Sequence, residues 1–140
     1  MMKRVALVSC VKHKRGEASP ARDLYLSPLF CGLRRYAESQ SDAWYILSAE
    51  YGVVAPDQVV APYDRALNTM GRKERLSWAQ RVQRQLAELI APGMQVIVLA
   101  GNRYRQDLVP FLQARGCLVT VPFAGLKIGE QLHRLKAMFP

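Results

Sequence analysis

The chain has 140 residues, of which 20 are Lys or Arg and 11 are Asp or Glu, and its formal net charge is +9 at pH 7. This length predicts one domain, residues 1–140, with a hydrophobic core, and no apolar run approaches the roughly 18 residues of a membrane span. The positive charge indicates a polyanionic partner or an anionic ligand, although many small proteins are basic for no specific reason.

Strands and helices alternate from the start of the chain. The apolar run in residues 5–9 is typical of a strand that is covered on both faces. The pairs Ser19-Pro20 and Ser27-Pro28 each predict a helix start, because serine is a common N-cap and proline suits the first helical position. Apolar residues at helical spacing follow the second pair, and residues 44–48 form the second predicted strand.

A connection of about seventeen residues, 48–64, precedes the next helix, although the median connection has about 4–6 residues. That helix is expected from about residue 72 to 90, because one apolar stripe runs along it. A third strand at 96–100 leads into a helix that Pro110 should kink. A fourth strand at 118–121 precedes the last helix.

This alternation predicts an α/β fold, a three-layer αβα sandwich in which four parallel strands form one sheet. All the strand-to-helix connections then emerge at the carboxyl edge of the sheet, where open α/β folds bind ligands. The long connection contains several valines and two tyrosines, which is not a disordered composition. We therefore expect it to fold over the edge as the wall of a site, with Pro62-Tyr63-Asp64 returning to close it.

Two of the connections at this edge are strongly basic. Lys12 and Lys14 lie in the first and Arg103 and Arg105 lie in the third, and each connection leads toward a helix N-terminus, where phosphates bind readily. Tyrosines in or near the connections can stack on nucleobases, with core packing as the alternative for some of them. The other residues expected to bind a ligand are Ser9, Cys10, Ser48, Tyr51, Gly52, Tyr63, Gly101, Asn102, Tyr104 and Gly125.

Acidic residues are scarce at this edge, so each one is informative. Glu50 directly follows a buried strand and precedes Tyr51-Gly52, which makes it the first candidate for general acid or base catalysis. Asp64 is the second candidate catalytic residue, with a helix cap or a turn as its alternative role. These residues leave open whether the protein is an enzyme.

The cysteines and histidines indicate neither a metal nor a cofactor. The three cysteines are odd in number, widely separated and without a CxxC pair, which argues against a disulfide framework or a zinc site and fits a reducing cytoplasm. Cys10 stands near three cations that could lower its pKa, but a small buried hydrophobe is its commoner role. No cluster of histidines and carboxylates has the spacing of metal ligands.

Three segments, YLSPLF, WYILSAEYGVVAPDQVVAPYD and PFAGLKIGEQL, together resemble a small, largely uncharacterised family of bacterial and phage domains. The middle segment is also similar to the motif Leu-Ser-x-x-Tyr-Gly, Pro-x-Asp and Pro-Tyr of the peroxide-stress YaaA family. Members of that family are associated with DNA binding and with protection from oxidative damage. The matching residues are Leu47, Ser48, Tyr51, Gly52, Pro56, Asp57, Pro62 and Tyr63.

More loosely, the arrangement resembles the uracil-DNA glycosylase fold, and VIVLAGNRYRQ resembles a third strand and turn of that superfamily. The resemblance implies a sheet with the strand order 2-1-3-4 and a base pocket at its carboxyl edge. Two usual glycosylase positions differ here. The first connection lacks an acidic or amide residue, and Pro122-Phe123 stands where a histidine is usual.

The sequence therefore predicts a cytoplasmic protein of nucleic-acid metabolism or protection. It would bind a nucleotide or an exposed nucleobase at the carboxyl edge, with action on an N-glycosidic bond as one reaction open to it. The alternative is a non-catalytic, basic DNA-binding protein of stress protection that coats the phosphate backbone. A small-metabolite enzyme comes third, and the sequence does not distinguish DNA, RNA and free nucleotide or give the oligomeric state.

Overall fold

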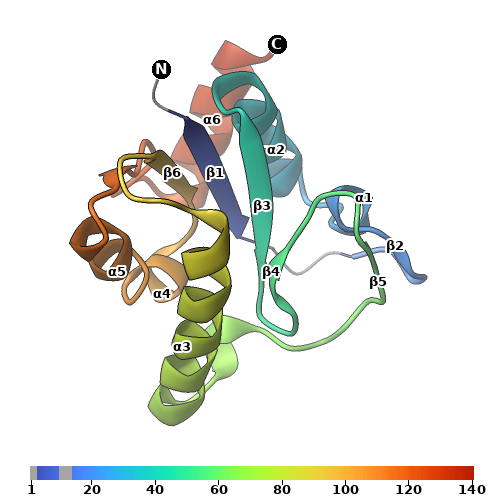
Figure 1. Ribbon diagram of the computed structural model, residues 1–140. Coiled ribbons are helices and arrows are strands. Elements are labelled where there is room, and N and C mark those ends of the chain that lie inside the picture. The colour runs from blue at the N-terminus through green and yellow to red at the C-terminus, as the bar shows by residue number, and fades with distance from the viewer. Residues whose placement is uncertain (1–2, 10–13) are drawn as a thin grey trace.

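A mostly parallel sheet of five strands forms the centre of the protein (Figure 1). The computed structural model describes residues 3–9 and 14–140. The strands lie in the order β4-β3-β1-β6-β7. Their bounds are Gly52–Val54 for β4, Ala43–Ser48 for β3, Arg4–Ser9 for β1, Gln95–Leu99 for β6 and Leu118–Thr120 for β7.

The sheet differs from the predicted one because β4 was not expected. The four predicted strands pair in parallel and keep the mutual order β3-β1-β6-β7, but β4 pairs antiparallel with β3 at the edge. The prediction of four strands in an all-parallel sheet is therefore wrong. At the start of β4, Gly52 has a φ of +74°, which glycine adopts without the steric cost that a side chain imposes. The returning strand is only three residues long, too short for a periodic pattern to reveal it.

Helices cover both faces of the sheet, as Figure 1 shows. On one face lie α3 (Arg72–Leu89) and α5 (Val109–Ala114), and on the other lie α2 (Pro28–Gln40) and α6 (Ile128–Met138). In β1, Val5 and Leu7 pack on the α3 side, whereas Ala6 and Val8 pack on the α2 side. This alternation follows from the strand geometry, which directs successive side chains to opposite faces. The protein is therefore built in three layers.

The two serine-proline pairs behave differently. The Ser27 hydroxyl accepts a hydrogen bond from the backbone N–H of Phe30 at 3.1 Å, so Ser27 caps α2 as predicted. Ser19 and Pro20 instead form β2 (Ser19–Pro20), which pairs antiparallel with β5 (Val59–Val60) from the long connection. The short helix α1 (Ala21–Leu24) begins only after this pair. Pairing with a distant segment overrides the local helix signal at Ser19.

The region around Pro110 forms two helices in place of one kinked helix. The first, α4 (Asn102–Arg105), ends before α5, and Pro110 lies in the first turn of α5, where its missing N–H leaves no hydrogen bond unmade. Before α3, a short 3₁₀ helix, η1 (Leu67–Thr69), ends the long connection. Within the described residues, no helix combines the length and the apolar character that crossing a membrane requires.

Candidate functional site

Polar and aromatic side chains gather at the carboxyl ends of β1 and β3. We call this group the tyrosine cluster, and its members are Lys14, Tyr25, Ser48, Tyr51 and Tyr63. Ser48, the last residue of β3, is completely buried. Its hydroxyl accepts hydrogen bonds from the backbone N–H groups of Glu50 at 3.2 Å and Tyr51 at 3.0 Å, and it donates to the Tyr63 hydroxyl at 2.9 Å. Ser48 thereby joins the β3–β4 turn to the returning end of the long connection.

Tyr63 is the centre of the cluster. Its hydroxyl is 2.8 Å from that of Tyr25, and its ring meets the Tyr51 ring edge to face, with 5.4 Å between the centroids. The Lys14 ammonium group lies 4.4 Å from the centroid of the Tyr63 ring, within the range of a cation–π interaction. Tyr25 is buried, whereas Lys14, Tyr51 and Tyr63 are partly exposed. A ligand can therefore reach the latter three.

The long connection returns across this edge, as its composition and length predicted. In its last third, β5 pairs with β2, and the Tyr51 hydroxyl donates a hydrogen bond to the carbonyl of Ala61 at 3.0 Å. Further on, Tyr63 reaches Ser48. These contacts hold the connection against the carboxyl end of β3, and its role as the wall of a binding site stays a prediction.

The two candidate acids lie beside the cluster. The Glu50 side chain is 39% exposed, and its carboxylate is 4.0 Å from the Arg65 guanidinium group, which also pairs with Glu74 at 3.1 Å. The backbone carbonyl of Glu50 accepts a hydrogen bond from Arg81 of α3. Asp64 is exposed next to Tyr63. Ion pairs this exposed add little to stability, and a catalytic role for either acid stays a prediction.

The connection after β6 contains one exposed arginine and two residues that contact other parts of the fold. Arg103 is exposed, whereas Arg105 donates a hydrogen bond at 2.9 Å to the carbonyl of Ala100, the residue that follows β6. Between them, the Tyr104 ring packs edge to face on Trp78 of α3, with 5.5 Å between the centroids. The indole N–H of Trp78 in turn donates to the carbonyl of Ser48 at 2.9 Å. Trp78 therefore links the third connection to the tyrosine cluster.

The remaining predicted ligand-binding residues are spread over the same edge. Ser9 ends β1 and is buried, Gly52 is buried in the β3–β4 turn, and Gly125 is exposed in the connection that follows β7. Exposed positions also include Gly101 and Asn102. Cys10 and Lys12 lie outside the described residues. In the part of the chain that is described, no three His, Cys, Asp or Glu side chains gather closely enough to hold a metal ion.

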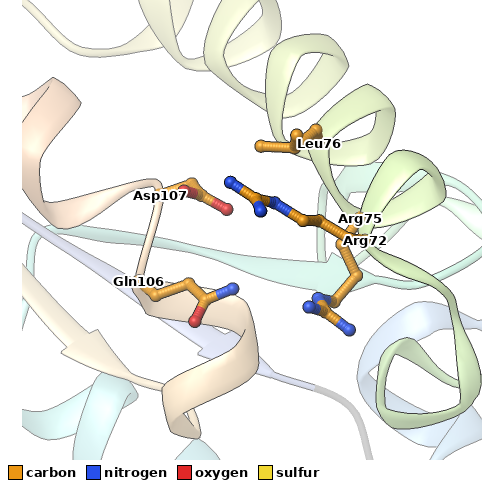
Figure 2. A pocket seen from close by; sticks show the side chains of 5 residues that line it. All are labelled: Arg72, Arg75, Leu76, Gln106 and Asp107. Atoms are coloured by element: carbon orange, nitrogen blue, oxygen red, sulfur yellow. The ribbon is translucent and has the colours of Figure 1, made fainter.

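A pocket of about 350 Å³ between α3 and the segment after α4 was not predicted (Figure 2). Its lining residues are Arg72, Arg75, Leu76, Gln106 and Asp107. In the sequence this helix is recognisable by its apolar stripe, and no binding role was predicted for its first turn. One sequence signal could have indicated this pocket. Arg72 and Arg75 lie three positions apart at the start of the helix, where anions are favoured.

The fold and this edge define the chain as a mostly parallel α/β domain with a polar cluster at the carboxyl ends of its strands. The chain belongs to the DUF6884 family, a family of unknown function whose model matches residues 5–137. The uncharacterized protein YfjM of Bacillus subtilis (strain 168) is 35% identical to it over 115 residues, which are 76% of this chain and 75% of YfjM. The expected resemblance to an uncharacterised family is thereby confirmed.

Among solved structures, the crystal structure of AF0587, a protein of unknown function, matches with a TM-score of 0.55 and 19% sequence identity. The match covers 99% of this chain but only 44% of that one, so this chain spans less than half the length of AF0587. Likeness at this identity shows the fold alone. None of these three descriptions states an activity, so the resemblance to the YaaA family and to uracil-DNA glycosylases stays a prediction.

Proposed function

We propose that this protein binds a nucleotide or an exposed nucleobase of a nucleic acid at the carboxyl edge of its sheet. The observation that carries the proposal is the Lys14 ammonium group 4.4 Å from the ring centroid of Tyr63, with the Tyr51 ring against the same tyrosine. Partly exposed aromatic rings beside a cation supply the two interactions of single-strand binding, base stacking and charge attraction.

The charge around the cluster supports the same proposal. The net charge of +9 gives the protein a field that attracts polyanions. At this edge Lys14 is partly exposed, and Arg103 and Arg65 are exposed in two other connections. Phosphate contacts from such side chains provide most of the affinity for nucleic acid regardless of its sequence, while the tyrosines can stack on a base.

Fluorescence anisotropy with a labelled single-stranded oligonucleotide tests the proposal. Affinity should fall with salt at a log–log slope of about −0.7 for each neutralised phosphate. Lys14→Gln and Arg103→Gln should each flatten that slope by up to about 0.7 and weaken binding for every oligonucleotide sequence. Arg103 suits this test better than Arg105, because Arg105 also holds the end of β6 through a hydrogen bond.

The matched control is Lys136→Gln, which removes the same charge near the end of α6, where the C-terminus lies away from the carboxyl edge (Figure 1). The control should bind like the wild type. If Lys14→Gln, Arg103→Gln and Lys136→Gln all lost the same oligonucleotide affinity, net charge alone would explain the loss. That result would refute a site at this edge. Failure to bind any DNA, RNA or nucleotide at low salt would refute the proposal altogether.

Whether the edge also catalyses cleavage of an N-glycosidic bond depends on Glu50. A carboxylate can stabilise the cation-like sugar of such a reaction or activate the attacking water. Glu50→Gln keeps the shape of the side chain and removes its charge, so an enzyme should lose turnover while its affinity changes only a few-fold. The assay is release of free base from a defined oligonucleotide.

The non-catalytic alternative, a coat on the DNA backbone for stress protection, is favoured by the contacts of Glu50. Its carboxylate takes part in an exposed ion-pair network with Arg65. In a coat protein, Glu50→Gln should slightly strengthen DNA binding, because a negative charge leaves a positive edge. The two functions therefore predict different main effects of Glu50→Gln, a loss of turnover for the enzyme and slightly stronger DNA binding for the coat protein.

A further inference from the structure

The pocket between α3 and α4 combines two cations with a carboxylate and an amide (Figure 2). The side chains of Arg72 and Arg75 extend from the first turns of α3 toward Gln106 and Asp107, which follow α4. A volume of about 350 Å³ is within the usual range of roughly 300–1,000 Å³ for small-molecule sites. The pocket therefore has room for a compact polar ligand.

The walls of the pocket are held in place by hydrogen bonds that a ligand does not need to break. The Gln83 side chain of α3 donates to the backbone carbonyl of Asp107 at 2.9 Å. One guanidinium nitrogen of Arg75 donates to the carbonyl of Met70 at 3.0 Å, and the Nε of Arg75 is buried without a partner. Arg75 thus enters the pocket from an anchored position, which lowers the ordering cost of binding.

The charges inside the pocket are not paired with one another. Figure 2 shows the Arg75 guanidinium group directed toward the Asp107 carboxylate. Within the described residues, however, the ion pairs closer than 4.0 Å do not include Arg72, Arg75 or Asp107. Arg75 and Asp107 are partly buried and Arg72 is exposed, and charges that face each other without an ion pair leave space for a ligand that offers an anion to the arginines and a donor to the carboxylate.

We propose that this pocket binds the ribose phosphate of a nucleotide. Arg72 and Arg75 would accept the phosphate, since guanidinium groups hold phosphate oxygens through charged, often bidentate hydrogen bonds. Asp107 would accept hydrogen bonds from the ribose hydroxyls, as carboxylates do in nucleotide sites, and Gln106 offers one more donor and acceptor. This inference rests on the proposed function. It adds a pocket for the ribose phosphate and predicts a preference for ribonucleotides.

A plain anion fits the pocket less well than a nucleotide. An inorganic phosphate would meet the Asp107 carboxylate as well as the arginines, and like charges repel at such distances. A ribose phosphate separates its negative group from its hydroxyl donors and matches both ends. Trp78 follows Arg75 by one helical turn of α3, and its indole N–H donates a hydrogen bond to the carbonyl of Ser48 in the tyrosine cluster. Indole fluorescence can therefore report binding.

Titration calorimetry and tryptophan fluorescence with AMP, dAMP, adenosine and inorganic phosphate test the site. The wild type should bind AMP at least about tenfold tighter than dAMP, adenosine or phosphate, because each of these lacks a charged hydrogen bond that AMP makes. Arg72→Gln should weaken AMP binding about tenfold or more without a change in adenosine binding. Asp107→Asn should reduce the preference for AMP over dAMP to within a few-fold.

The matched control is Lys73→Gln, which removes one charge next to Arg72 in the same turn but does not line the pocket. It should bind AMP within about twofold of the wild type. Arg72 is the main test residue because Arg75 also donates a hydrogen bond to the carbonyl of Met70. Arg75→Lys is a second variant: it keeps the positive charge but cannot form a bidentate contact with phosphate, so it should bind AMP more weakly.

Two results would overturn the inference: equal AMP affinity in the wild type and in Arg72→Gln, or equal affinity of the wild type for AMP and dAMP. If oligonucleotide binding still depends on Lys14, either result would refute the pocket as a nucleotide site and leave the proposed function intact. Failure of oligonucleotide binding, with AMP binding still dependent on Arg72, would refute the tyrosine cluster as a nucleic-acid site and leave the pocket as a nucleotide site. The failures of the two proposals are therefore distinguishable.

Discussion

Replacing Ser48 with alanine tests the role of the hydroxyl that organises the candidate site. The side chain is completely buried, and its oxygen makes three hydrogen bonds, two accepted from backbone N–H groups and one donated to Tyr63. Alanine fits the space and keeps the strand, but it leaves all three partners without that oxygen. Ser48→Ala should therefore destabilise the protein while the rest of the core stays unchanged.

The magnitude follows from the groups that lose their partner. Each partly buried N–H left without an acceptor costs about 1–2 kcal/mol, and the Tyr63 hydroxyl keeps its contact with Tyr25. The free energy of unfolding should fall by about 2–4 kcal/mol in total. At roughly 3 °C per kcal/mol for a domain of this size, the melting temperature should fall by about 6–12 °C.

Urea unfolding followed by tryptophan fluorescence measures this change, together with a thermal scan by circular dichroism. The dependence of the unfolding free energy on urea should stay the same, because the surface exposed on unfolding is the same. Ser39→Ala is the matched control. That serine is exposed on α2, donates one hydrogen bond to a backbone carbonyl, and should change stability by less than about 0.5 kcal/mol.

The double variant with Tyr63→Phe separates the tyrosine contact from the backbone contacts. A coupling energy of about 0.5–1.5 kcal/mol is expected between the two side chains. A loss in Ser48→Ala no larger than that in Ser39→Ala would refute the reasoning, because it would mean that the turn does not depend on the hydroxyl. A coupling energy of zero would refute the Ser48–Tyr63 bond alone.

Three further outcomes concern other parts of the fold. Gly52→Ala should cost more than about 1 kcal/mol in denaturant unfolding, because φ is +74° and a Cβ would clash with the Gln85 side-chain oxygen. Burial raises the pKa of the Cys117 thiol above its ordinary value, so peptide mapping at pH 8 should show slower alkylation there than at the exposed Cys31. Arg115→Gln removes two hydrogen bonds to carbonyls near the end of α3 and should lower the unfolding free energy by about 1–2 kcal/mol.

Much of the architecture was predictable from local patterns. Residues 5–9 and 96–100 are apolar at nearly every position, and such strands are stable only where helices cover both faces of a sheet. The Ser27 cap and the apolar stripe of 72–90 marked two helices, because capping and helical periodicity act within a few residues of the chain. Alternation of such elements then implied a parallel sheet with its connections at one edge.

The candidate site was predictable only in outline. The sequence indicated that the long connection returns to the edge and that Lys14, Ser48 and Tyr63 belong there. It did not show that the Ser48 hydroxyl is buried and fully engaged, because that depends on where Tyr63 arrives from fifteen residues away. Nor did it indicate that Arg75 faces Asp107 across a pocket.

The sequence by itself therefore determined the repeating elements and their covered faces, since those follow from short-range sterics and from the burial of apolar side chains. Tertiary structure alone decided the pairing of β2 with β5, the antiparallel strand β4 and the pocket beside α4. The segments that form the β2–β5 pair and the pocket lie far apart in the chain, whereas β4 follows β3 directly, and in each case a contact of a few residues leaves no periodic signal. Their positions are set by the long-range hydrogen bonds and packing that the folded chain makes available.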